Sequence, residues 1–123
     1  MSDQTQAVLN HHLSSLGENN LEEIMKDYTE QSEIWTAKGP LKGLVQIRSF
    51  FSASLPLLPP GMTKFDITQM IVKDEHAYIA WSSDSPIASI PMGADSFVIK
   101  EGKIMLQTVA MQILTKTALS ASI

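Results

Sequence analysis

Residues 94–113, ADSFVIKEGKIMLQTVAMQI, decide the fold class. Two runs rich in β-branched and aromatic residues flank Glu101-Gly102, a pair typical of a tight turn. If this pair forms a two-residue turn, Lys100 pairs with Lys103 and the runs lie antiparallel. The sequence therefore predicts a hairpin of two strands, residues 94–100 and 103–113.

One face of this predicted hairpin is apolar until its far end. In the register set by the turn, the face consists of three pairs: Ile99 with Ile104, Phe97 with Leu106, and Asp95 with Thr108. A carboxylate that continues an apolar row is costly to bury in its charged form, so it reaches water, finds donors or takes up a proton. Two interpretations remain open: Asp95 enters an apolar pocket, or it ends its strand in solvent.

Helices are expected before residue 60. The spacing of Leu9, Leu13 and Leu16 predicts a helix over about residues 5–16, and Gly17 is a natural terminator. Asn20 is placed to cap a second helix. A third helix is indicated by an apolar row and by the proline that follows it: Leu44, Ile47, Phe51, Leu55 and Pro56.

Strands are expected between and after these helices. Residues 32–36 predict a brief strand that ends in a turn at residues 38–40. From residue 63 the periodicity becomes extended, and Asp74-Glu75 joins runs 65–73 and 76–83, while Asp84 precedes Pro86 in a predicted loop. Segregated helices and strands predict one α+β domain, residues 1–123, with its core over about residues 5–114 and its helices on one face of the sheet. The tail from residue 115 is expected to fray.

The composition excludes several classes of protein. There is no cysteine, which rules out disulfides, thiolate metal sites and cysteine nucleophiles. The chain has nine basic and thirteen acidic residues, and the basic ones form no cluster, which argues against a nucleic-acid partner. The N-terminus lacks the features of a signal peptide and no apolar run is long enough to cross a bilayer. We therefore expect a cytoplasmic protein without a membrane partner.

The three histidines do not indicate a metal site. His11 and His12 are adjacent and point about 100 degrees apart on a helix. His76 follows the predicted turn at Asp74-Glu75 and is expected to be solvated. The sequence therefore predicts neither a bound metal nor a cofactor.

Three groups of residues, spread over about residues 7–113, carry a likeness to a known family. They are His12-Leu13-Ser14-Ser15-Leu16 with Asn20-Leu21, Lys42-Gly43 followed by Ile47-Arg48-Ser49-Phe50-Phe51, and Asp95-Ser96-Phe97 leading to Gly102-Lys103-Ile104. In order and spacing they resemble the NTF2-like superfamily, specifically its ketosteroid isomerase and SnoaL-like polyketide cyclase branch. The resemblance implies a cone in which three N-terminal helices pack in a strongly curved antiparallel sheet around a deep apolar cavity.

The resemblance also implies roles for individual residues. In ketosteroid isomerase an aspartate base moves a proton, while a tyrosine and a protonated aspartic acid donate hydrogen bonds to the developing oxyanion. Matching the motifs puts Asp95 at the position of the protonated aspartic acid and His12 at that of the tyrosine. Thr36 stands at the position of the base and cannot accept a proton near neutral pH. In a SnoaL-type cyclase, Asp95 would serve as both acid and base for an aldol closure.

Aromatic side chains are expected around the implied cavity. Each fits plain core packing when taken alone, but together they indicate a cavity for a flat apolar ligand. The candidate ligand-binding residues are Tyr28, Trp35, Thr36, Phe51, Trp81, Phe97 and Thr108.

The resemblance implies a homodimer that pairs through the sheet face away from the cavity. In the predicted register this face carries a mixed row: Ser96, Val98, Met105, Gln107, Val109 and Met111. Two hypotheses for function stay open. The chain is an isomerase or cyclase acting on a small hydrophobic carbonyl compound, or it is a non-catalytic binding or dimeric scaffold module, as the missing base at Thr36 favours.

Overall fold

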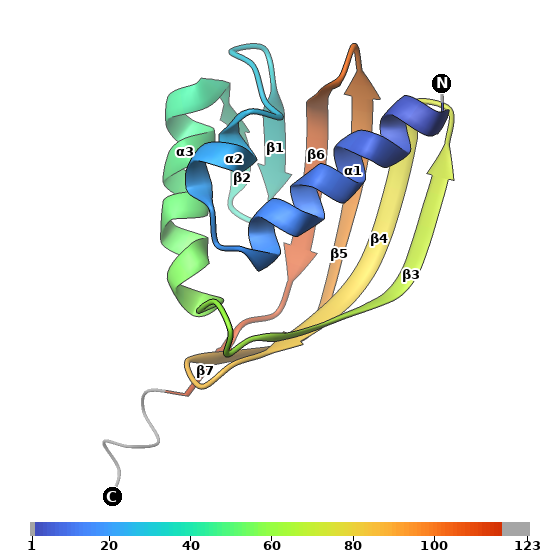
Figure 1. Ribbon diagram of the computed structural model, residues 1–123. Coiled ribbons are helices and arrows are strands. Elements are labelled where there is room, and N and C mark those ends of the chain that lie inside the picture. The colour runs from blue at the N-terminus through green and yellow to red at the C-terminus, as the bar shows by residue number, and fades with distance from the viewer. Residues whose placement is uncertain (1, 117–123) are drawn as a thin grey trace, which may run out of the picture.

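The computed structural model describes residues 2–116, in which helices precede most of the strands (Figure 1). In chain order the elements are α1 (Ser2–Gly17), α2 (Leu21–Met25), β1 (Glu33–Thr36), β2 (Gly39–Lys42), α3 (Gly43–Ser54), the 3-10 helix η1 (Leu55–Leu57), β3 (Lys64–Lys73), β4 (His76–Asp84), β5 (Ala88–Lys100), β6 (Lys103–Met111) and β7 (Leu114–Thr115). The three predicted helices are confirmed. Asn20 caps α2, because its side chain accepts a hydrogen bond from the backbone N–H of Glu23.

The strands form a mixed sheet in the order β2-β1-β6-β5-β4-β3, with β7 paired to β5. The α+β class is confirmed, but the expected purely antiparallel order is wrong because β1 runs parallel to β6. Hairpin turns force neighbouring strands to be antiparallel, and no hairpin joins β1 to β6. The expected strong curvature is also wrong, because the sheet bends without curling strongly and stays open at its edges, β2 and β3.

The β5–β6 hairpin contains the predicted turn. Glu101 and Gly102 both have positive φ angles, 53° and 76°, as a two-residue turn of this kind requires. Lys100 pairs with Lys103 and Ile99 with Ile104, as predicted.

Beyond Ile104 the predicted register is wrong. A bulge shifts the pairing by one residue between Ile99 and Val98, so that Phe97 pairs with Gln107 and Asp95 with Val109. Since strand side chains alternate between faces, a shift of one residue exchanges the faces of all that follow. Gln107, Val109 and Met111 therefore face the helices, and Leu106 and Thr108 lie on the outer face.

Two strand segments that contain proline differ from expectation. The predicted turn at residues 38–40 instead leads into β2, where Pro40 is tolerated because β2 is an edge strand. β5 begins at Ala88, and Pro91 lies where the β4–β5 register shifts.

Asp84, predicted in a loop, is the last residue of β4. Thr115 belongs to β7 rather than to a frayed tail, and the rest of that predicted tail from residue 117 lies outside the described residues.

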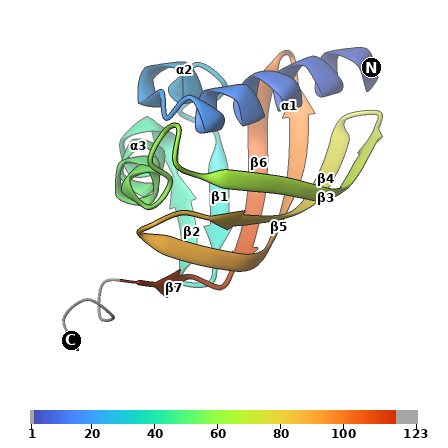
Figure 2. The same ribbon diagram turned by 60° about the horizontal axis from the view of Figure 1, so that its bottom comes forward.

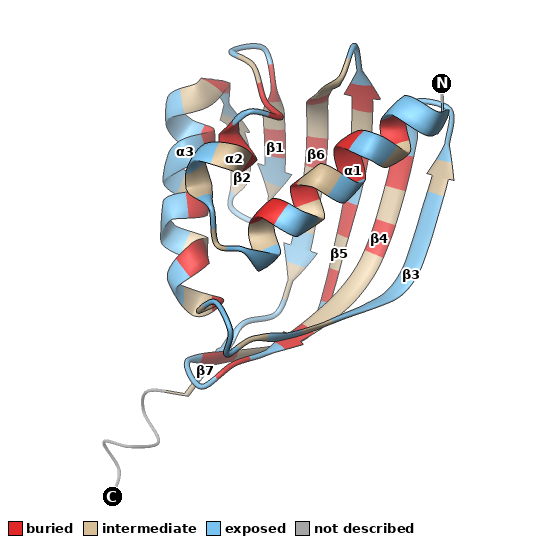
Figure 3. Cartoon of the chain, in the orientation of Figure 1, coloured by how far each residue is buried: buried red, intermediate tan, exposed pale blue. Residues whose placement is uncertain are grey.

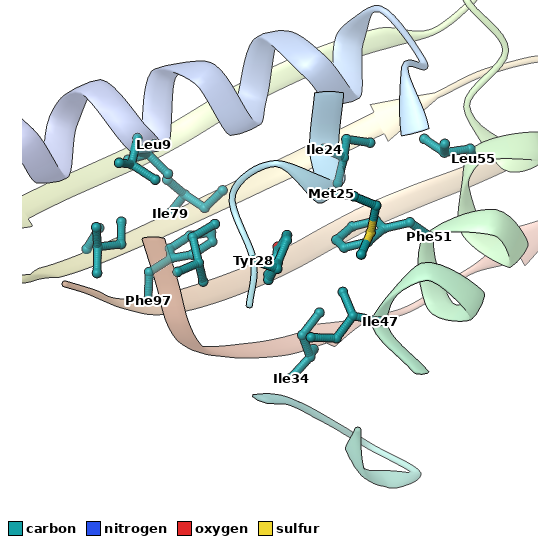
Figure 4. Close-up of a cluster of buried hydrophobic side chains, with 14 residues drawn as sticks. Leu9, Ile24, Met25, Tyr28, Ile34, Ile47, Phe51, Leu55, Ile79 and Phe97 are labelled. Carbon is teal, nitrogen blue, oxygen red and sulfur yellow. The ribbon is translucent and has the colours of Figure 1, made fainter. Parts of the chain in front are cut away.

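The helices cover one face of the sheet, as predicted. α1 lies across β3, β4 and β5, while α3 packs beside β1 and β2 (Figures 1 and 2). Buried residues alternate along the central strands and follow the inner sides of the helices (Figure 3). Side chains from all three helices and from the sheet point into one cluster, including Leu9, Ile24, Ile47, Ile79 and Phe97 (Figure 4). Ile79 and Phe51 of this cluster also line the cavity described next.

Candidate functional site

A cavity of about 260 Å³ lies between the helices and the inner face of the sheet. Its wall is mostly apolar, with Leu16, Phe50 and Phe51 on the helical side and Phe65 and Val109 on the sheet. The polar side chains that reach it are His12, Ser54, Asp95 and Gln107. Ser54 donates its hydroxyl hydrogen to the Phe50 carbonyl oxygen. The polar groups of interest for a ligand are therefore those of the other three residues.

Asp95 is the acidic residue of this cavity and is 7% exposed. Its Oδ1 atom accepts a hydrogen bond of 2.9 Å from Nε1 of Trp81, and its Oδ2 atom accepts one of 2.8 Å from Nε2 of Gln107. Burial raises the pKa of Asp95 to about 6, while the bonds from Trp81 and Gln107 act in the opposite direction. Of the two interpretations left open by the sequence, the pocket is the one the structure has.

Gln107 is held by a second hydrogen bond. The Tyr28 hydroxyl donates to Oε1 of Gln107, which leaves the Nε2 hydrogens of the same amide directed at Asp95. Tyr28 is fully buried, and its pKa is raised well above the usual value, first by burial and then by the charge of Asp95. Tyr28 therefore remains a neutral donor. A chain of two hydrogen bonds runs from the Tyr28 hydroxyl to the Gln107 amide and from that amide to the Asp95 carboxyl group.

His12 is the second titratable group at the cavity and is 1% exposed. Its ring makes edge contacts with Tyr28, Phe51 and Phe97, with centroids 5.6 to 6.2 Å apart. Burial, and next the charge of His11, lower the pKa of His12 to about 4, so the imidazole is neutral near pH 7. Its Nδ1 atom has no hydrogen-bond partner among residues 2–116, which is uncommon for a buried polar atom.

Comparison with known proteins gives a likeness of fold. No protein-family model matches the chain, and no curated protein matches it in sequence. The epoxide hydrolase/cyclase-like enzyme SalBIII, which has a role in pyran ring formation in the polyether salinomycin, is 16% identical with a TM-score of 0.77; the match covers 94% of this chain and 100% of SalBIII.

Two further structures are similar to the same extent. A candidate ketosteroid isomerase from Kribbella flavida is 14% identical with a TM-score of 0.72, over 89% of this chain and 78% of that one. An NTF2-like protein of unknown function from Mesorhizobium loti is 19% identical with a TM-score of 0.73, over 90% and 93%. The chain has the NTF2-like fold. Because this NTF2-like fold is shared by proteins described as isomerases, as SnoaL-like cyclases and as of unknown function, the fold alone does not decide the activity.

Within the NTF2-like fold, the predicted site residues fall into three groups. His12, Phe51, Trp81 and Asp95 line the cavity together. Tyr28 and Phe97 are buried behind its wall, where Tyr28 bonds Gln107 and Phe97 packs against His12.

The other three predicted residues do not line the cavity. Trp35 is 50% exposed on the outer face, since its neighbour Ile34 is the residue of β1 that faces inward. The Thr36 hydroxyl donates to the Gly39 carbonyl oxygen within the β1–β2 turn. Thr108 lies on the outer face because of the bulge in β6. The residue at the position where the resemblance places the catalytic base is thus the last residue of β1, and its hydroxyl is bonded across the turn that follows.

Gln107 is the site residue that the sequence did not indicate. The two-residue turn predicted it on the outer face, together with Val109 and Met111, and all three line the cavity instead. Only the bulge near Met105 would have revealed that these residues face inward, and no residue type there predicts a bulge.

His11 lies outside the cavity and joins α1 to α2. Its Nδ1 atom is 2.8 Å from Oδ2 of Asp27, and its Nε2 atom is 2.9 Å from Oε1 of Glu23. These two bonds, that of Glu23 first, raise the pKa of His11. Among the residues described, no three His, Asp or Glu side chains are grouped as a metal site requires. Within the same part of the chain, no helix has the length and apolar character needed to cross a membrane.

Proposed function

We propose that the cavity binds a small, uncharged and largely apolar compound with a carbonyl-type oxygen, and that Asp95 acts on it as an acid and base in an isomerase or cyclase reaction. The observation that carries this proposal is the placement of the Asp95 carboxyl group, buried in an apolar cavity with both oxygens fixed by donors. A carboxyl group with a pKa of about 6 exists in both forms near neutral pH, as proton transfer in both directions requires.

The reaction follows from the two titratable groups. Ionised Asp95 removes a proton from the carbon next to the ligand carbonyl, and the electrons of the broken C–H bond pass to the carbonyl oxygen. A neutral imidazole is a hydrogen-bond donor suited to such an enolate oxygen, which is the role proposed for His12. Asp95 then returns the proton, either to another carbon of the ligand or to the alkoxide formed when the enolate carbon attacks a second carbonyl.

The class of ligand follows from the lining of the cavity. Among the side chains that the structure describes, no Lys or Arg lines the cavity. The carboxyl group of Asp95 also disfavours an anionic ligand, because a buried charge needs a partner of opposite sign. The volume of about 260 Å³ exceeds that of cavities of about 150 Å³ that hold benzene, so a ligand of roughly ten non-hydrogen atoms fits. Asp95 and Gln107 lie beside the core residue Phe97, whereas Met111 lies further along the sheet. The oxygen of the bound ligand is therefore expected toward Phe97 and its apolar part toward Met111.

Measurements of turnover test the catalytic part of the proposal. We expect a panel of enones and linear diketones to contain a compound that the wild type converts, and Asp95→Asn to reduce its turnover by at least about 100-fold. Asp84→Asn, which alters an exposed carboxylate of the same sheet paired with Lys116, is the matched control and should retain full activity. Turnover that survives unchanged in Asp95→Asn contradicts the catalytic role.

Binding without chemistry is a second candidate function. It is favoured by Thr36, which lies where the resemblance places the base and whose hydroxyl donates to the Gly39 carbonyl oxygen instead. A ligand that binds the folded state alone raises the melting temperature. If 2-nonanone raises the melting temperature and no compound of the panel is converted, the chain is a binding module; octanoate, with the same number of non-hydrogen atoms and a negative charge, should not bind.

We also propose that two copies pair through the outer face of the sheet. Five residues form a row across neighbouring strands on this face: Ile71, Tyr78, Ser96, Thr108 and Trp35. Ile71 is 52% exposed and Trp35 is 50% exposed, and apolar surface of this kind favours a partner. Light scattering at micromolar concentration should give a dimer, and a monomer would refute the pairing.

A further inference from the structure

Trp81 reaches Asp95 by lying over Gly93. Trp81 and Gly93 are directly opposite in the β4–β5 pair, and Asp95 is two residues further along β5 on the same face. An aromatic side chain spans such a diagonal distance. The indole nitrogen is a donor only, so its bond of 2.9 Å to Oδ1 always presents a hydrogen to the carboxyl group.

The indole occupies the space that a side chain at position 93 would need. A Cβ atom added to Gly93 would lie 2.4 Å from Cε2, 2.5 Å from Cζ2 and 2.8 Å from Nε1 of Trp81. Gly93 is buried, and it is not among the glycines with positive φ, so its backbone does not require glycine. Glycine inside a strand often marks a place where another group approaches closely, and here that group is the donor of Asp95.

The second donor of Asp95 has a similar support. The Gln107 amide can present either its oxygen or its nitrogen to Asp95, and the Tyr28 hydroxyl decides between them by donating to Oε1. An ionised Asp95 by itself favours the amide nitrogen, because a carboxylate only accepts hydrogen bonds. A protonated Asp95 can pair with either end of the amide, and without the Tyr28 hydroxyl the Gln107 oxygen can turn toward it and stabilise the protonated form.

We propose that Gly93 and Tyr28 are positioning residues of the candidate site, which hold the Trp81 indole and the Gln107 amide as donors to Asp95 without touching it. The inference rests on the proposed function, in which Asp95 carries the chemistry. It predicts that both residues set the balance between the two forms of the Asp95 carboxyl group, because donors favour the ionised form.

The test is the carboxyl titration of Asp95, followed by ¹³C NMR and assigned with Asp95→Asn. Gly93→Ala, Trp81→Leu and Tyr28→Phe should each move the titration upward by about one pH unit, as expected for the loss of a hydrogen bond to a charged group. In the Trp81→Leu background, Gly93→Ala should add nothing, because the donor that it displaces is already gone. Gly17→Ala, where nothing lies within 4 Å of the added carbon, and Tyr78→Phe on the outer face are controls that should leave the titration unchanged.

Several outcomes would overturn the inference. For Gly93 these are an unchanged titration in Gly93→Ala, or a further rise when Gly93→Ala is added to Trp81→Leu. For Tyr28 it is an unchanged titration in Tyr28→Phe. If Gly93→Ala does not fold but the double variant with Trp81→Leu does, the clash with the indole is confirmed; if neither folds, Gly93 serves another purpose and its role is refuted.

The titration separates this inference from the proposed function. Asp95→Asn without effect on turnover would remove the proposed chemistry and leave the titration results standing. Conversely, a variant that moves the titration should also move the pH profile of turnover, whereas damage to the fold alone would lower activity at every pH.

Discussion

The indole nitrogen of Trp81 lies 2.9 Å from Oδ1 of Asp95, and both side chains face the same apolar cavity. This bond and the one from Gln107 supply part of the stabilisation that the carboxylate loses when it leaves water. The remaining cost of burial appears as a pKa of about 6. The structure therefore keeps an ionisable acid in surroundings that would otherwise hold it protonated.

The stability of the protein should depend on Asp95 in a defined pH window. The folded pKa of about 6 lies above the ordinary value of 3.8, so the folded state binds the proton more tightly and loses stability as pH rises from about 4 to about 6. The difference corresponds to about 3 kcal/mol. Urea unfolding at a series of pH values should show Asp95→Asn gaining this amount relative to the wild type across the window. Parallel curves for the two proteins would contradict the prediction.

His12 should have the opposite effect in nearly the same window. Its folded pKa of about 4 lies below the ordinary 6.5, so the unfolded chain takes up the proton first and stability falls as pH drops from about 6.5 to about 4. The loss corresponds to about 3 kcal/mol. In His12→Phe, which keeps a ring among Tyr28, Phe51 and Phe97, this loss should be absent when unfolding is compared at pH 7 and pH 4.5. A variant that loses as much stability as the wild type would show that His12 already accepts a proton when folded.

His11 should stabilise the contact between α1 and α2 at low rather than high pH. Its pKa is raised, so its contribution is present below pH 6.5 and is lost as pH rises through the folded pKa. Because its side chain is 37% exposed, solvent screens the pairs with Glu23 and Asp27, and we expect His11→Asn to lower stability by about 1 kcal/mol or less. Denaturant unfolding at pH 5.5 and pH 9, at low and high salt, measures it. An effect that grows with pH would mean that the ion pairs are not its source.

Filling the cavity should abolish ligand binding without unfolding the protein. Val109 is partly buried and lines the cavity, so Val109→Phe places a ring where the ligand is proposed to lie. Val98→Phe makes the same change in size on the outer face and is the matched control. NMR titration with 2-nonanone should show binding to the wild type and to Val98→Phe, but not to Val109→Phe. Equal binding by all three would place the ligand elsewhere.

The sequence predicted the parts of the site that depend on local pattern. The alternation within one strand places Asp95 on the same face as Ile99 and Phe97, although the sequence leaves open whether it enters a pocket or ends its strand in solvent. The turn at Glu101-Gly102 was recognised because its residue types suit positive φ angles.

The rest of the site depends on relations between strands. A single bulge exchanges the faces of Gln107 and Thr108 relative to the prediction, and it shows only in the pairing of β6 with β5, because no residue type near Met105 predicts it. The placement of Trp35 outside and Ile34 inside could not be decided from two apolar neighbours in a strand of four residues. The parallel pairing of β1 with β6 joins segments about seventy residues apart, for which no turn gives a signal.

The pKa of Asp95 in the wild-type protein decides whether this carboxyl group can act as an acid near neutral pH. It can be taken from the ¹³C shift of the carboxyl carbon, assigned by the absence of that signal in Asp95→Asn. We expect a value of about 6, because a carboxyl group in the apolar cavity resists ionisation despite the bonds from Trp81 and Gln107. A value near the ordinary 3.8 would contradict it, since Asp95 would then be a solvated or fully compensated carboxylate with no proton to give near neutral pH.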